Sequence, residues 1–205
     1  RYFDKSMPES VDWQYLTAEN SAYDLHAIKT LFSELYPSKW IASGISKGGT
    51  TTMLYATFFP GDVDIYVPYV GPHCTSVEDG RFEGFFKEVG TPETREKIYK
   101  FQLTLLKNRT ALMPSFDDFC KSQNLEFRVP LEEIFDYCVL EYAFTFWQWG
   151  MNPEVIPSEG ADNQTLLKHL LEVVPPDYFS TQNSHSSFFV QAAKELGYYP
   201  YQTRQ

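Results

Sequence analysis

The feature that most constrains this chain is a glycine-flanked serine, Ser46, between two apolar segments. Gly44 to Gly48 read Gly-Ile-Ser-Lys-Gly, the G-x-S-x-G pattern of a nucleophile elbow, which needs a buried strand before the serine and a helix after it. Residues 40–42 are apolar and follow a turn, and residues 52–59 form an apolar helical stretch closed by Pro60-Gly61. The segment therefore predicts a strand, a sharp turn at Ser46 and a helix.

This turn also predicts a chemistry. A side chain at Gly44 or Gly48 is expected to collide with neighbouring backbone, which explains both glycines. The helix begins directly behind the serine, so its unpaired N–H groups and positive dipole end face any oxyanion formed at Ser46. The N–H of Lys47 is the predicted first donor. The Lys47 ammonium is not the expected base, because neighbouring side chains point apart in such a turn.

Two other interpretations compete for these residues. In the first, Ser46 only caps the helix, as serine commonly does. In the second, the loop is a phosphate-binding P-loop. The P-loop is disfavoured, because it requires Gly-Lys-Ser/Thr in that order, whereas here Lys47 precedes Gly48 and Gly49.

Composition limits the class of ligand and the redox chemistry. The 205 residues suggest one large domain or one domain with an insertion, and the net charge of -10 argues against a nucleic-acid partner. Aromatic residues make up 17% of the chain, which indicates a deep apolar interior or an aromatic-lined cleft. Cys74, Cys120 and Cys138 have no CxxC spacing, so no zinc site is expected; three buried thiols are favoured over one disulfide plus a thiol.

No run of 18 apolar residues predicts a membrane span, and no signal peptide opens the chain. The sequence does not begin with Met, so both ends are expected to be cut.

The N-terminal segments predict part of an α/β fold. Thr17 is the expected cap of a helix whose apolar stripe packs on a sheet, with Asp24 and His26 on or near its opposite face; the stripe is Ala18, Leu25, Ile28, Phe32 and Leu35. Residues 63–70 predict a second strand. Strand, helix and strand make a parallel unit with Ser46 at its carboxyl edge, where His73 also follows; a hydrogen-bonded loop histidine is the favoured interpretation of His73.

Helical patterns dominate after about residue 80. We expect helices over residues 92–112, 115–123, 131–149, 162–173 and 176–196. A block of helices after strands predicts residues 1–78 as part of a catalytic core and residues 79–205 as a largely helical cap that leads back to it.

The chain resembles the secreted bacterial prolyl tripeptidyl aminopeptidases. The resemblance runs from Arg1-Tyr2-Phe3 and Asp12-Trp13 through the Ser-Lys-Gly-Gly form of the elbow to Glu141-Tyr142-Ala143-Phe144 and Glu195-Leu196-Gly197-Tyr198. These are serine peptidases of the α/β-hydrolase fold, related to Pro-Xaa carboxypeptidases. The resemblance implies a partial α/β-hydrolase core plus cap, an internal fragment of a member, no cofactor or metal, and a secreted or periplasmic location.

The resemblance also implies an exopeptidase mechanism. Ser46 would attack the peptide bond after the third residue of a substrate, with a second oxyanion donor from backbone near Tyr2-Phe3. The triad acid and histidine are expected beyond residue 205, so this fragment alone is expected to be inactive.

A substrate with a free N-terminus needs an anion, and Glu141 is the predicted one, because an acid inside an aromatic helix is costly to bury without a cationic partner. An ion pair of Glu141 with an Arg or Lys of the cap is the equal alternative. Trp147 and Trp149 are predicted to line the pocket, although core packing is the commoner role at this spacing.

Other functions remain open. One is a triad of Ser46 with Asp177 and His185, which follow in the right order. Others are an esterase or lipase type of serine hydrolase, and a hydrolase-like binding module without turnover. Oligomeric state does not follow from the sequence.

Overall fold

The computed structural model describes residues 12–183 and 185–201. The chain divides into two compact units, residues 1–79 with 184–200 and residues 80–183 with 201–205. The sequence-based division placed residues 184–200 in the cap, whereas by contacts they belong with the first unit.

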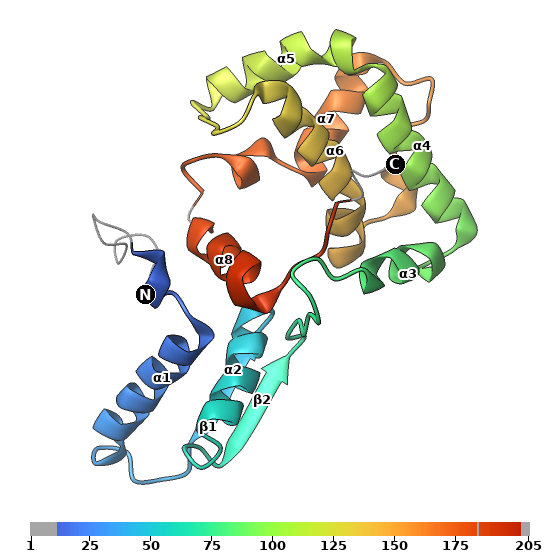
Figure 1. Cartoon of the computed structure of the whole chain (residues 1–205). Helices are drawn as coiled ribbons and strands as arrows, with labels where there is room; N and C mark the ends of the chain where they lie inside the picture. The colour runs from blue at the N-terminus through green and yellow to red at the C-terminus, as the bar shows by residue number, and fades with distance from the viewer. Residues whose placement is uncertain (1–11, 184, 202–205) are drawn as a thin grey trace. The chain divides into compact units, whose positions relative to one another are not determined.

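The first unit is built on a parallel pair of strands joined by a helix. β1 (Ile41–Ile45) pairs with β2 (Ile65–Tyr69), with Ile41 opposite Ile65 and Ile45 opposite Tyr69. The connecting helix, α2 (Lys47–Phe58), lies along the two strands (Figure 1). The predicted strand, helix and parallel strand are confirmed. This arrangement is consistent with part of an α/β fold.

The other face of this sheet is apolar and open. Ile41 and Ile45 on β1 and Ile65 and Tyr69 on β2 are exposed, whereas Ala42 and Tyr66, which point the other way, belong to a small core with Tyr55 and Val63; that core also contains Ala22, Leu25, Trp40 and Phe59. Alternation of side chains along a strand explains the two faces.

Helix α1 (Ala18–Ser33) packs differently from the prediction. Thr17 caps it, as expected, by accepting from the N–H of Asn20. The predicted apolar stripe is largely exposed, with Ile28, Phe32 and Leu35 in solvent. The helix packs on α2 instead, and His26, predicted near the opposite face, turns inward.

The His26 ring explains this packing. It stacks on Phe59 at a centroid distance of 4.3 Å, and its Nδ1 lies 2.7 Å from Asp62 Oδ2, which also accepts from the Tyr55 hydroxyl at 2.7 Å. An aromatic stack and a side-chain hydrogen bond therefore hold this face of α1 against α2 in place of the apolar stripe.

The segment that starts at α8 (Ser186–Gln191) and ends at Tyr198 bonds to the rest of the first unit at two places. Helix α8 runs into the π-helical turn η5 (Ala192–Leu196), where Lys194 Nζ donates to the Trp13 carbonyl at 2.7 Å and Glu195 Oε2 accepts from Ala18 N–H at 2.6 Å. The backbone of Tyr198 then bonds Val77 and Asp79. The segment thus holds the start of α1 and the chain that follows β2.

The second unit is helical. Its helices are α3 (Arg81–Glu88), α4 (Pro92–Lys107), α5 (Arg109–Ser122), α6 (Leu131–Gln148) and α7 (Asn163–Val173), with the 3-10 turns η3 (Pro153–Val155) and η4 (Pro176–Phe179); Figure 1 shows α4 to α7 in green to orange. A further 3-10 turn, η2 (Trp13–Tyr15), belongs to the first unit.

The core of this unit is one cluster that α6 dominates. Phe135, Cys138, Val139, Tyr142 and Phe146 of α6 are fully buried in it. The predicted helix over residues 131–149 is therefore confirmed within one residue. Asp162 caps α7 by accepting from Thr165 N–H at 2.9 Å, so the helix predicted over residues 162–173 begins one residue later, at Asn163.

The predicted helices differ from the structure in three places. Residues 92–112 form two helices that break at Asn108, and the second of them continues through Pro114 to Ser122. Helix α3 had no predicted counterpart. Residues 176–196 are not one helix, because Ser180 Oγ donates to the Asp177 carbonyl and Asn183 to the Tyr178 carbonyl, and these bonds compete with helical ones.

Candidate active site

Ser46 occupies the turn between β1 and α2. Its φ of 55° and ψ of -122° lie outside the usual regions for an L-residue, and its side chain is exposed. Its N–H still continues the strand ladder by donating to the Tyr69 carbonyl at 3.0 Å, while its carbonyl accepts from Thr50 N–H in the first turn of α2. Strain of this kind, held by bonds on both sides, is typical of functional sites.

The hydroxyl of Ser46 does not cap the helix. Ser46 stands at the N-cap position, yet its side chain makes no capping hydrogen bond. The interpretation of Ser46 as a simple helix cap is therefore wrong. An exposed hydroxyl at the N-terminus of a helix can act as a nucleophile, and the positive end of the helix dipole can then stabilise the oxyanion that forms on the attacked carbonyl group.

Close backbone packing explains some of the glycines. A Cβ at Gly44 would lie 2.3 Å from the Gly48 carbonyl oxygen, and one at Gly49 would lie 2.6 Å from the Tyr69 carbonyl oxygen. The expected collision at Gly44 is confirmed. At Gly48 the expectation is wrong, because a Cβ there meets nothing within 4 Å. Gly49 is the second glycine that the turn requires.

The residues that follow β2 pack against the first turn of α2. A Cβ at Gly71 would lie 2.7 Å from the Gly49 carbonyl carbon, and Thr50 Oγ1 donates to the Pro72 carbonyl at 2.6 Å. Between Tyr69 and Gly71, Val70 has a φ of 40° and is 80% exposed. A β-branched residue in this region is an outlier, so this segment carries strain beside the elbow.

Lys47 is the first residue of α2, and the role of its N–H as an oxyanion donor stays a prediction. Burial lowers the pKa of its ammonium. The predicted second donor, near Tyr2-Phe3, lies outside the described residues.

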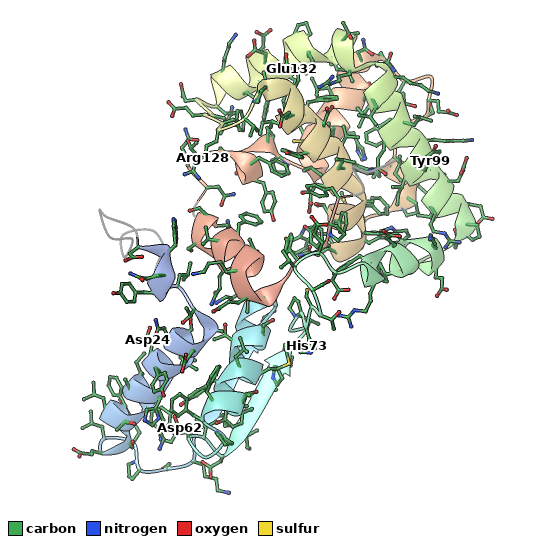
Figure 2. The ribbon with its side chains drawn as sticks, in the orientation of Figure 1. Asp24, Asp62, His73, Tyr99, Arg128 and Glu132 are labelled. Carbon is green, nitrogen blue, oxygen red and sulfur yellow. The ribbon has the colours of Figure 1, made fainter. Side chains whose placement is uncertain are left out.

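His73 lies in the exposed loop after β2, at the carboxyl edge of the strands, as expected. Figure 2 shows it beyond the end of β2, whereas Asp62 lies ahead of the strand. The other pair considered for a triad is split between the units: Asp177 lies in η4 of the second, and His185 precedes α8 in the first.

Glu141 lies on α6 in the second unit and is 5% exposed. Its Oε2 accepts from the Tyr201 hydroxyl at 2.7 Å, and its Oε1 lies 3.5 Å from Thr145 Oγ1. A buried carboxylate is therefore present where the sequence predicted one. Tyr201, which the sequence did not single out, is bonded to it.

The two predicted pocket tryptophans have different surroundings. Trp147 packs against the core cluster, and its ring is so close to Gly90 that a Cβ there would lie 2.3 Å from it. Trp149 ends α6 and is 73% exposed. Their part in substrate binding stays a prediction.

Cys120 and Cys138 are buried in the second unit, and Cys74 is partly exposed in the first; all three are free thiols. The alternative of one disulfide is wrong, and full burial holds for two of the three. Burial raises the pKa of Cys120 to about 11. Within the described residues no cluster of three or more His, Cys, Asp or Glu could hold a metal ion, and no described helix is long and apolar enough to cross a bilayer.

Two comparisons with known proteins identify relatives. Residues 1–168 match the family described as PS-10 peptidase S37. The chain is also 26% identical over 204 residues to the prolyl tri/tetrapeptidyl aminopeptidase of Streptomyces mobaraensis, an alignment that covers 96% of this chain and 43% of that protein. The chain therefore spans less than half the length of this relative. No solved structure matches it significantly.

Proposed function

The chain belongs to the PS-10 peptidase S37 family, and on this premise we propose that it supplies the nucleophile of a serine exopeptidase that releases N-terminal tripeptides. The observation that carries the proposal is the conformation of Ser46, strained and exposed at the head of α2. The printed name of the Streptomyces relative, a prolyl tri/tetrapeptidyl aminopeptidase, supports the substrate class and a proline-type preference.

In the proposed reaction, Ser46 Oγ attacks the carbonyl carbon of the peptide bond after the third residue. A histidine, which by the resemblance is not among these 205 residues, takes the hydroxyl proton and gives it to the departing amine as the C–N bond breaks. The tripeptide remains as an ester on Ser46 until water hydrolyses it. The Lys47 N–H stabilises the tetrahedral oxyanion, and one such donor contributes about 3 kcal/mol to lowering the barrier.

Glu141 is the proposed partner of the substrate ammonium. Its burial supports this role, because a carboxylate removed from water binds a cation more strongly than one at the surface. Trp147 and Trp149 are the proposed aromatic lining. A peptide with a free N-terminus is thus the proposed ligand, and a secreted or periplasmic location is proposed from the resemblance.

Active-site labelling of the full-length protein with a peptidyl phosphonate tests the nucleophile. We expect one covalent adduct on Ser46, seen by mass spectrometry, and no adduct in Ser46→Ala. A folded, full-length protein that never forms this adduct would instead be a binding module without turnover.

The substrate class needs its own assay. Peptides that carry proline at the third position and a free N-terminus should release a tripeptide, whereas the same peptides with an acetylated N-terminus should react poorly. Glu141→Gln should raise KM for the free peptides with little change for the acetylated ones. Preferred cleavage of simple acyl esters over all peptides would favour an esterase.

A further inference from the structure

One face of α6 presents an acid between two aromatic rings. Tyr137, Glu141 and Phe144 are spaced four and three residues apart, and such residues are neighbours along one side of a helix. Tyr137 and Phe144 are only partly buried, whereas the carboxylate between them is almost fully buried. The helix therefore holds an acid within an aromatic wall.

Tyr201 joins this face from 60 residues away in the sequence. Its ring stacks with Tyr137 at a centroid distance of 5.9 Å and meets Phe144 edge-on at 6.0 Å. Its hydroxyl donates to Glu141 Oε2 at 2.7 Å. The two rings fix the position of the Tyr201 ring, and this position aims the hydroxyl at one carboxylate oxygen.

The two aromatic neighbours are themselves supported. Phe144 meets Phe86 of α3 edge-on at 4.6 Å, and Tyr137 contacts Phe179 of η4 at 5.8 Å. Offset and edge-to-face pairs of this kind restrict ring rotation. The environment of Tyr201 is therefore built from three elements of the same unit.

A hydrogen bond from a phenol to a carboxylate is charge-assisted and short. It partly replaces the water that a buried carboxylate loses. A carboxylate offers about four acceptor positions, and this bond occupies one of them, on Oε2. The contact from Thr145 Oγ1 to Oε1 is 3.5 Å long and contributes little to orientation. The Tyr201 hydroxyl is thus the stronger of these two restraints.

We propose that Tyr201 is a positioning residue for substrate binding: its hydroxyl holds Oε2 of Glu141, and this sets the direction in which Oε1 meets the ammonium of a peptide N-terminus. The proposal rests on the proposed function, in which Glu141 binds that ammonium. Tyr201 acts through Glu141 and needs no contact with the reacting carbonyl.

The test is a double-mutant cycle in the full-length protein, with a free tripeptidyl substrate. Tyr201→Phe keeps the ring and removes the hydroxyl, and it should raise KM about tenfold or more, because a bond to a charged group is lost, with kcat changed less than twofold. In the Glu141→Gln background, Tyr201→Phe should add almost nothing. If the effects of the two substitutions on KM add fully in the double variant, the proposal is overturned.

Tyr199→Phe is the matched control, because it removes one hydroxyl two residues away, where the Tyr199 oxygen accepts from Tyr198. KM should then stay within twofold of the unaltered protein. An equal rise of KM in Tyr199→Phe would overturn the proposal, since the effect would not be specific to the bond with Glu141.

Phosphonate labelling of Ser46 separates this proposal from the proposed function. An unaltered protein that forms no adduct contradicts the proposed function. If the unaltered protein labels but Tyr201→Phe leaves KM unchanged, only the positioning role fails. At a saturating concentration of phosphonate, where differences in binding no longer affect the rate, Tyr201→Phe should label at the unaltered rate; slower labelling there would show that Tyr201 supports the nucleophile or the fold instead, which also overturns the proposal.

Discussion

Ser46 and Val70 lie at the same level of the sheet, each directly after one of the register partners Ile45 and Tyr69, and both have positive φ, 55° and 40°. The two strands therefore end in strained residues side by side, linked by the bond from Ser46 N–H to the Tyr69 carbonyl. Gly49 and Gly71 pack tightly behind them. The strain belongs to the whole carboxyl edge of the pair and not to the serine alone.

Replacement of Val70 should relieve part of this strain. Asparagine adopts positive φ more easily than a β-branched residue, and the exposed Val70 side chain loses little packing. We expect Val70→Asn to stabilise the protein by about 1 kcal/mol, measured by thermal unfolding. Val77→Asn, at another exposed valine whose φ is not positive, should change stability by less than about 0.5 kcal/mol. Equal effects of the two would contradict strain at Val70.

The glycines of the elbow should respond very differently to alanine. Gly44→Ala forces a Cβ against the Gly48 backbone, so we expect a loss of about 3 kcal/mol or more in the free energy of unfolding. Gly48→Ala meets open space inside a helix and should be neutral or stabilising by up to about 1 kcal/mol. Urea unfolding of both variants measures the difference. Similar losses in the two would mean that the turn is not packed as described.

Asp62 should contribute stability that disappears in acid. Burial alone would raise its pKa, but hydrogen bonds from Tyr55 and His26 hold the pKa below its usual value of 3.8. As the pH falls, Asp62 therefore stays charged down to a lower pH in the folded chain than in the unfolded chain. Its contribution is full above about pH 4 and is lost as the pH falls through the folded pKa.

The measurement is urea unfolding of Asp62→Asn between pH 3 and 8. We expect a loss of about 1 to 3 kcal/mol at pH 7, because the Tyr55 hydroxyl and the His26 ring lose a charged acceptor. The difference in the free energy of unfolding between the variant and the unaltered protein should become smaller below pH 4. Glu34→Gln, at an exposed acid after α1, should show neither effect.

His169 should make the second unit sensitive to mild acid. Its Nε2 lies 2.8 Å from the Tyr142 hydroxyl inside the helical core, and burial lowers its pKa below 6.5. As the pH falls below 6.5, His169 therefore binds a proton more readily in the unfolded chain than in the folded chain. Stability is full above about pH 6.5 and falls as the pH drops below that value.

Unfolding of His169→Gln as a function of pH measures this contribution. The substitution should lower stability at pH 7, because a buried ring is lost, but should flatten the decline between pH 6.5 and 5. His73→Gln, at an exposed histidine, should keep the decline of the unaltered protein. An unchanged slope in His169→Gln would rule out this histidine as its source.

Features of the fold and the site that depend on residues close together in the sequence could be predicted. The elbow, the parallel order of β1 and β2, the buried stripe of α6 and the cap at Thr17 were predicted from local residue patterns. Gly49 was missed, although its signal was present: it is the second of two adjacent glycines after the serine. The pattern did not show which of the two would be packed against the end of β2.

Other features could not be predicted because they depend on partners distant in sequence. The inward orientation of His26 depends on Phe59 and Asp62. The break between α4 and α5 at Asn108 has no proline or glycine beside it in the sequence that would predict it. The bond between Tyr201 and Glu141 spans 60 residues and leaves no periodic signal.

The sequence by itself determined a serine on a strained turn between a strand and a helix, because sterics between nearby backbone atoms allow only glycine at Gly44. Tertiary structure alone decided which side chains surround the buried acid of α6 and which face of α1 packs inward. Those outcomes depend on where the chain returns in space, and many arrangements of the same helices satisfy the same local periodicities.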